Sequence, residues 1–224
     1  MVELITGLRA EVVRENLERV RTQIAEAGRD PDTVEVLAAV KYVPVEELGV
    51  LAEAGVTVVG ENRAQDLVAK AEAYPGAFTW DFIGHLQSRK VKQVLPHVRY
   101  VETVASDSAL EQLGRHGGPE TEILVEVNVA GEEGKSGIPP DQLPEFIERC
   151  PVKVVGLMTM PPLAPDPEAS RPYFSALREL AAEHDLPQLS MGTSQDYVVA
   201  AQEGATIVRL GSTLYRPSGQ SGAS

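Results

Sequence analysis

Two cationic side chains stand where they could act on an aldehyde cofactor or substrate. Lys41 closes the apolar run Val-Leu-Ala-Ala-Val, and desolvation makes an amine a better nucleophile towards aldehydes, with which it forms a Schiff base. Lys41 could equally cap a strand and extend into solvent. Arg209 stands between Val208 and Leu210. Because a buried arginine is costly unless it is paired, Arg209 either meets a carboxylate or faces a ligand.

Glycines and hydroxyl side chains gather in two further segments. Ser190-Met-Gly192 and Gly211-Ser212 each end an apolar run, and Ser194 begins the next helix-like stretch. Glycine lets the backbone approach a ligand, and hydroxyls and amides in such turns can bind phosphate oxygens. Either segment alone is compatible with an ordinary turn and a capping serine. Together they predict a phosphate site, with a heterocycle beside Arg209.

An arginine beside a pyridine-type ring has a chemical consequence. A cation facing the ring nitrogen keeps that nitrogen unprotonated, so the ring is a weaker electron sink than one with an acidic partner. Asn62 ends another apolar run and could reach the imine or a ring hydroxyl near Lys41. Its neighbour Glu61 is either a ligand contact or part of a structural ion pair, and we favour the ion pair.

Other reactive side chains give weaker signals. The four histidines show no metal-ligand spacing, and His85 is the one histidine expected near the site. Lys135 lies in Glu-Glu-Gly-Lys-Ser-Gly, which lacks the full P-loop spacing, so we reject nucleotide binding there and leave open a ligand or partner contact. Cys150 is the single cysteine, which excludes an internal disulfide and indicates a reducing, cytoplasmic location.

These candidate residues fall at the ends of eight short β-branched runs separated by helix-like stretches. The expected strands cover residues 34–41, 56–62, 79–84, 100–106, 122–129, 152–160, 188–192 and 206–211. The expected helices cover residues 45–54, 64–73, 87–95, 107–115, 140–149, 168–184 and 194–203, and one or two amphipathic helices over 2–27 precede them.

Eight such alternations predict an α/β fold, a single (β/α)8 TIM barrel with an extra N-terminal helical segment. In these barrels, functional residues gather at the carboxyl ends of the strands, which is where the candidate residues stand. An open doubly wound sheet is the alternative. The first strand-to-helix turn, Lys41-Tyr-Val-Pro, lacks the glycine fingerprint of that fold, so the barrel is favoured.

Length and charge narrow the function further. The 224 residues fit one domain, which we expect over 1–217, followed by a Ser/Gly-rich tail over 218–224 that we expect to be disordered. A net charge of −13 argues against binding of nucleic acid or anionic membranes. Charges throughout residues 1–21 argue against a signal peptide or a membrane span there.

The ordered motifs resemble those of the pyridoxal 5′-phosphate (PLP) homeostasis protein family, whose fold is similar to the N-terminal barrel of alanine racemase. The resemblance extends from the first expected strand to Tyr215. It is carried by Ala38-Ala-Val-Lys41, Gly60-Glu-Asn-Arg63, Phe82-Ile-Gly-His-Leu-Gln-Ser88, Gly134-Lys-Ser-Gly137, Gly156-Leu-Met-Thr-Met160, Leu189-Ser-Met-Gly192 and Val208-Arg-Leu-Gly211.

The resemblance implies PLP as the cofactor and gives each candidate residue a role. Lys41 would hold PLP as a Schiff base (an aldimine), Asn62 would contact the ring, and Arg209 would face the pyridine nitrogen. Ser190 and the Gly211-Ser212 turn would take the phosphate. The implied cofactor-binding set is Lys41, Asn62, Ser190, Met191, Arg209, Gly211 and Ser212. No catalytic residue and no metal ligand is assigned.

The chain departs from the family pattern in three places, which cover four residues. Thr193 stands where the family often has Met, Ser212 where it often has Thr, and Tyr215-Arg216 where Phe-Gly is usual. Serine in place of threonine keeps the hydroxyl group, and the other two departures put only local packing in doubt.

Three classes of function remain open. The first is a carrier that buffers PLP in vitamin B6 and amino-acid homeostasis, without substantial catalysis, and supplies PLP-dependent apoenzymes. Fewer than twenty residues follow the last expected strand, so we expect no second β domain of the racemase type and a monomer. The second is a small PLP-dependent amino-acid racemase or a Schiff-base aldolase. The third is a pure interaction module.

Overall fold

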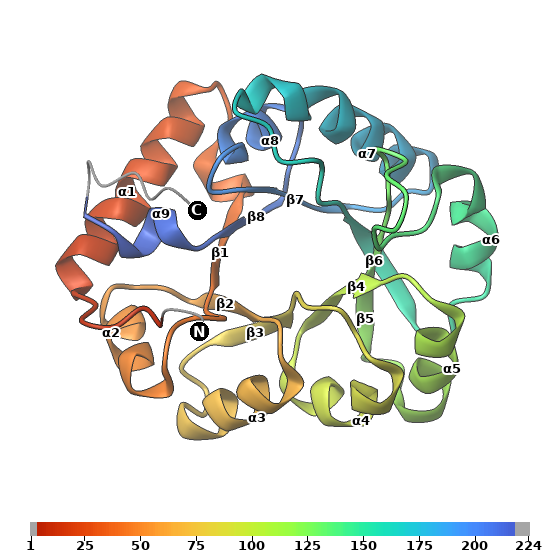
Figure 1. Cartoon of the computed structure of the whole chain (residues 1–224), viewed down its shortest axis with the longest axis horizontal. Coiled ribbons are helices and arrows are strands. Elements are labelled where there is room, and N and C mark those ends of the chain that lie inside the picture. Colours follow the sequence, from red (N-terminus) through yellow and green to blue (C-terminus); the bar gives the residue numbers. More distant parts are fainter. Residues whose placement is uncertain (1–3, 218–224) are drawn as a thin grey trace.

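A closed barrel of eight parallel strands forms the centre of the computed structural model, which describes residues 4–217. The strands pair in chain order, and β1 closes the ring against β8 (Figure 1). They are β1 (Glu35–Ala39), β2 (Val58–Glu61), β3 (Thr79–Phe82), β4 (Tyr100–Val104), β5 (Glu122–Glu126), β6 (Lys153–Met158), β7 (Gln188–Thr193) and β8 (Ile207–Leu210). The single (β/α)8 barrel expected from the sequence is confirmed. The tail over 218–224 lies outside the described residues.

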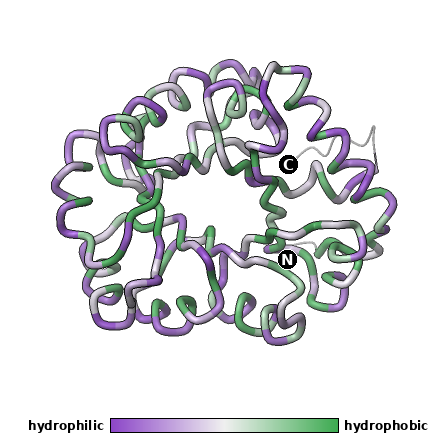
Figure 2. The backbone as a smooth tube through the Cα atoms, turned by 180° about the vertical axis from the view of Figure 1, so that it is seen from behind, coloured by the Kyte–Doolittle hydropathy of each residue, from purple (hydrophilic) through white to green (hydrophobic). Residues whose placement is uncertain are grey.

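Helices surround the barrel as an outer ring (Figure 1). The α-helices are α1 (Ala10–Glu26), α2 (Leu48–Glu53), α3 (Ala64–Ala73), α4 (Val91–Val94), α5 (Asp107–His116), α6 (Leu143–Glu148), α7 (Arg171–Glu183), α8 (Tyr197–Gln202) and α9 (Ser212–Tyr215). The short 3₁₀ turns are η1 (Pro31–Thr33), η2 (Val45–Glu47), η3 (Ser88–Lys90), η4 (Leu95–His97), η5 (Pro140–Gln142) and η6 (Pro167–Ser170). Figure 2 shows hydrophilic residues on the outer turns and hydrophobic stretches along the strands.

The N-terminal segment forms one helix, which is shorter than the expected region of one or two helices over 2–27. The helix begins only at Ala10, because the chain before it is tied to η2 in a non-helical form. The backbone N–H groups of Gly7 and Leu8 donate to the carboxylate of Glu47 at 2.7 and 3.1 Å, and Gly7 has a φ of 69°. A positive φ interrupts a right-handed helix, so the helix begins after this contact.

Two layers of buried side chains follow from the alternation along each strand. The large core lies between the strands and the helices and includes Leu67, Phe174 and Met191. Two small apolar clusters are separate from it, and successive strand residues point to opposite faces, so these clusters fill the barrel interior. One comprises Leu37, Val58 and Ile207, and the other comprises Leu124, Val155 and Met158. Polar residues share that interior, and they build the site described next.

Candidate functional site

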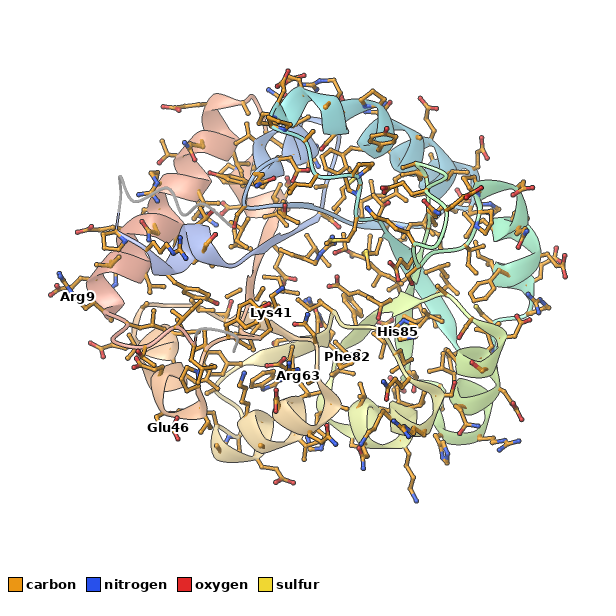
Figure 3. The ribbon with its side chains drawn as sticks, viewed as in Figure 1. Arg9, Lys41, Glu46, Arg63, Phe82 and His85 are labelled. Carbon is orange, nitrogen blue, oxygen red and sulfur yellow. The ribbon has the colours of Figure 1, made fainter. Side chains whose placement is uncertain are left out.

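Lys41 lies two residues beyond the end of β1, at the carboxyl end of the barrel. Figure 3 shows it near the central opening, whereas Arg9 and Glu46 lie at the outer rim. Its side chain is exposed, and Nζ lies 4.7 Å from the centroid of the Tyr42 ring. The position at the mouth agrees with the sequence, but the desolvation argued for this amine is absent. Among residues 4–217, no carboxylate forms an ion pair with Lys41, so its amine is accessible for reaction.

The turns after β7 and β8 meet beside this position. The backbone N–H groups of Gly211 and Thr213 donate to Oγ of Ser194 at 3.4 and 3.5 Å. A Cβ built on Gly211 would find its nearest neighbours, atoms of Ala39, 4.0 Å away. Ser212 is exposed in the same turn. The structure therefore brings hydroxyl groups and backbone amides from two strand ends to one open turn, as a phosphate site requires.

Gly192 explains why the turn after β7 reaches this point. Its φ is 91°, and an added Cβ would lie 2.5 Å from Cβ of Ala200 and 3.0 Å from Cα of Tyr197. Only glycine lets β7 end this close to α8. The turn is fixed further by Asp196, whose Oδ1 accepts from the backbone N–H of Thr193 at 2.7 Å. Ser194 lies within this short turn.

Arg209 lies inside the barrel and meets a carboxylate, the first of the two partners considered from the sequence. Only 6% of it is exposed. Nη1 donates to Oγ of Ser190 at 2.6 Å, and Nη2 donates to the carbonyl of Thr159 at 2.9 Å. A carboxylate oxygen of Glu102 lies 3.9 Å from Nη1. Arg209 also lines a cavity at the carboxyl end of the strands. Arg209 is therefore paired with side chains and a carbonyl inside the barrel, and it also borders a cavity that a ligand could enter.

Ser190 has a different position from the one expected. Its side chain is fully buried, and Oγ accepts from Arg209 while donating to Oε2 of Glu102 at 2.6 Å. Ser190 lies within β7 and points into the barrel, whereas Ser194 follows the end of β7 and reaches the Gly211 turn. Among the described residues, the Ser190 hydroxyl makes no hydrogen bond to that turn. Ser190 therefore contacts Arg209, and Ser194 is the serine at the Gly211 turn.

Glu102 is the buried acid of this interior group. Burial raises its pKa to about 7, while Arg209 and the hydrogen bond from Ser190 oppose the rise. Its Oε1 atom is buried and has no hydrogen-bond partner within residues 4–217. Burial likewise lowers the pKa of Arg209, and Glu102 counters that effect. The two groups therefore depend on each other for charge compensation in a water-poor interior.

Asn62 offers an unsatisfied atom next to the end of β1. Its Oδ1 is buried and has no hydrogen-bond partner among the described residues. Its backbone N–H donates to Oε1 of Glu61 at 2.7 Å, and Oε2 of Glu61 accepts from Lys70 at 2.5 Å. The structural ion pair expected for Glu61 is thereby confirmed. The Met191 side chain is fully buried in the large core, so only its backbone could meet a ligand.

A cavity of about 450 Å³ lies at the carboxyl end of the barrel, on the side opposite β1. It brings together His85, Lys135, Glu126 and Arg209. Lys135 pairs with Glu132, and Ser136 donates to Glu126 at 2.8 Å. A larger cavity of about 700 Å³ lies at the amino ends of the strands and contains none of the predicted site residues. The larger space is therefore remote from the candidate chemistry.

Residues 4–217 hold no group of three or more His, Cys, Asp or Glu side chains that could bind a metal ion. They also contain no helix long and apolar enough to cross a membrane.

Comparison with known proteins decides the family. The family model for the alanine racemase N-terminal domain matches residues 9–218. A pyridoxal phosphate homeostasis protein of Aquifex aeolicus is 40% identical over 213 residues, covering 89% of this chain and 93% of the relative. The chain belongs to the pyridoxal phosphate homeostasis protein family. A member from Homo sapiens is 32% identical, covering 88% of this chain and 82% of its own length.

Solved structures agree with membership of the pyridoxal phosphate homeostasis protein family. The crystal structure of an unknown protein from Bifidobacterium adolescentis matches with a TM-score of 0.82 and 32% identity, covering 96% of this chain and 98% of its own. PipY of Synechococcus elongatus PCC7942, solved with PLP bound, matches with a TM-score of 0.77 and 29% identity, covering 91% and 100%. Alanine racemase from Corynebacterium glutamicum has a TM-score of 0.72 at 14% identity, which shows a shared fold.

Sequence reasoning missed several residues that shape the site. Glu102 had a readable signal, because it is a carboxylate at an inward position of an apolar strand and needs a cation such as Arg209. The sequence predicts only that Ser194 begins a helix, although its hydroxyl lies at the Gly211 turn. Lys70 gave no signal, because a lysine on a short amphipathic helix is ordinarily exposed.

Proposed function

We propose that this protein binds PLP at the carboxyl end of the barrel, holds it through Lys41, and carries or buffers it without substantial catalysis. The observation that supports this most strongly is the convergence of Lys41, Arg209 and the Gly211 turn from the adjacent strands β1 and β8. The unpartnered Oδ1 of Asn62, the residue that follows β2, would supply a ring-side group. The names of the relatives and the PLP-bound PipY structure add independent support.

The open turn suits the phosphate. Backbone N–H groups of the Gly211-Ser212 turn and Thr213 would donate to its oxygens, and the hydroxyls of Ser194 and Ser212 would complete the contacts. A chain with a net charge of −13 does not attract anions as a whole. Binding therefore depends on these local donors, which explains why two strand ends contribute to one turn.

Lys41 would attach the aldehyde group, and Arg209 would contact the ring. The Lys41 amine condenses with an aldehyde to form a Schiff base and releases one water molecule, and the reverse reaction frees both partners. When bound, PLP supplies an electron-accepting ring to amines attached to its aldehyde carbon. Arg209 would face the ring nitrogen, held in place by Ser190 and Thr159. A cation there keeps the nitrogen unprotonated, which limits carbanion chemistry and favours storage over turnover.

We infer further that the carrier works as a monomer in the cytoplasm and supplies PLP-dependent apoenzymes. The exposure of the Lys41 side chain supports handover, because an acceptor amine can approach the attachment point from solvent. The single cysteine suits a reducing compartment.

Competition for released PLP tests the carrier function. Loaded protein is mixed with a PLP-dependent apoenzyme in the presence of an excess of a scavenger of free PLP, and apoenzyme activation is followed over time. Direct handover predicts activation that persists with the scavenger, and complete loss of activation contradicts it. A parallel assay compares conversion of L-alanine to D-alanine with that by free PLP. A rate well above that of free PLP would replace the carrier with a racemase.

A further inference from the structure

Lys70 is a buried cation directly behind the ends of β1 and β2. Its side chain is 7% exposed, and that of Glu61 is fully buried. Nζ donates to Oε2 of Glu61 at 2.5 Å and to the carbonyl of Val40 at 2.7 Å. Oε1 of Glu61 accepts from the backbone N–H groups of Asn62 at 2.7 Å and Arg63 at 3.3 Å. This buried pair has the additional hydrogen bonds that such pairs need, and it ties α3 to both strand ends.

Tyr215 reaches the same strand end from the other side. It belongs to α9, is 5% exposed, and its Oη donates to the carbonyl of Ala39 at 3.1 Å. Burial raises the pKa of the Tyr215 phenol, and the nearby charge of Glu61 raises it further. The phenol therefore remains a neutral donor at physiological pH. Its hydroxyl is the only group that distinguishes it from phenylalanine, which gives a small and specific test.

Lys70 and Tyr215 together occupy the last two carbonyl groups before Lys41. The Val40 backbone makes two further hydrogen bonds. Its carbonyl accepts from the N–H of Val43 at 3.0 Å, and its N–H donates to the carbonyl of Gly60 at 2.9 Å. The Lys41 side chain itself is exposed and lies over one aromatic ring. Its direction is therefore set mainly by the backbone that carries it.

We propose that Lys70 and Tyr215 are positioning residues for Lys41. By fixing the end of β1, they place the Lys41 amine against the carbonyl carbon of a bound aldehyde. Glu61 supports Lys70 and at the same time holds the backbone of Asn62, so one buried ion pair sets the spacing of two ligand-facing positions. The inference rests on the proposed function. Small misplacements of a reacting group lower rates strongly, by about a hundredfold for roughly 1 Å in demanding cases.

Schiff-base formation with added PLP measures this role in the full-length protein. The variants are Lys70→Met and Tyr215→Phe, and Lys92→Met, an exposed lysine on α4, is the matched control. Stopped-flow absorbance gives the rate constant for formation, a pH titration gives the midpoint of the Schiff-base band, and thermal unfolding reports stability. We expect formation to slow about tenfold or more in Lys70→Met and about threefold in Tyr215→Phe, with a shifted midpoint in both. Lys92→Met should match the unchanged protein.

The outcomes separate this inference from the proposed function. If neither the unchanged protein nor Lys92→Met forms the band, PLP attachment itself fails. If both form it and folded Lys70→Met and Tyr215→Phe react within twofold of them with the same midpoint, the positioning role is wrong, even when their melting temperatures fall. If Lys70→Met does not fold, the inference stands or falls with Tyr215→Phe, because removal of one hydroxyl leaves the ring packing intact.

Discussion

Nη1 of Arg209 lies 2.6 Å from Oγ of Ser190 in the interior of the barrel. Oγ of Ser190 in turn donates a hydrogen bond to Oε2 of Glu102, also at 2.6 Å. A hydroxyl group can donate once and accept from others, so Ser190 bridges Arg209 and Glu102, which also form an ion pair at 3.9 Å. Arg209 is therefore fixed by contacts inside the barrel, while the cavity beside it at the carboxyl end leaves space for a ligand.

Replacement of Ser190 by alanine should loosen Arg209. The change leaves one Arg209 N–H and one Glu102 oxygen without their partner in a buried setting, which costs about 1–3 kcal/mol. We expect lower stability in urea and weaker binding of both PLP and pyridoxal, since the effect acts on the ring. Equal affinities for pyridoxal in Ser190→Ala and the unchanged protein would contradict this role.

Replacement of Ser194 by alanine should give the opposite selectivity. The hydroxyl lies at the Gly211 turn, and a hydrogen bond to a charged group contributes about 1.5–3 kcal/mol. PLP binding should weaken about tenfold or more, whereas the affinity for pyridoxal, which lacks the phosphate, should stay within twofold. Titrations of the two ligands measure this directly. Loss of affinity for both to the same extent would remove Ser194 from the phosphate site.

The buried acid predicts a pH dependence of folding. Burial raises the pKa of Glu102 from 4.5 to about 7, with Arg209 and the hydrogen bond from Ser190 opposing and nearby Asp81 reinforcing the rise. The folded state therefore binds this proton more tightly than the unfolded state. The resulting stability is fully present below pH 4.5 and is lost as the pH rises through about 7, a loss of about 3 kcal/mol at most.

Glu102→Gln isolates this contribution, because glutamine has nearly the same shape and does not titrate. Urea unfolding between pH 5 and 8 should show a shallower pH dependence for the variant than for the unchanged protein, in the range set by the two pKa values. Identical slopes over that range would show that Glu102 does not change its protonation there.

Replacement of Gly192 by alanine should lower the stability of the protein. Alanine at this position combines a φ of 91° with a Cβ placed 2.5 Å from that of Ala200, so we expect a loss of about 3 kcal/mol in urea. Gly76 is the matched control, since its φ is 74° and an added Cβ would meet nothing within 4 Å. Gly76→Ala should cost only about 1 kcal/mol. Equal losses in the two variants would contradict the close packing of β7 against α8.

The barrel could be predicted because period and order are local properties of the sequence. Eight apolar runs alternating with amphipathic stretches leave few folds available, and the ends of those runs place Lys41, Asn62 and Arg209 at one rim. The strand ends were set too late by one or more residues at seven of the eight strands, because loop residues such as Val40 are as apolar as the strands they follow.

The interior contacts could not be predicted because they depend on which faces meet across the ring. Ser190 and Ser194 lie four residues apart, and only the closed barrel shows that one points inward and the other reaches the Gly211 turn. Lys70 and Tyr215 are separated from Lys41 by 29 and 174 positions in the sequence. Their carbonyl contacts follow from the packing of α3 and α9, which no local pattern specifies.

The most direct test of PLP attachment is the absorbance spectrum of the purified protein after addition of PLP and removal of the excess. The unchanged protein and Lys92→Ala should show a near-visible Schiff-base band, and borohydride should fix the ligand on the peptide that contains Lys41. Lys41→Ala should show no band and no fixed ligand. A band that persists in Lys41→Ala, or its absence from the freshly loaded unchanged protein, would contradict the account.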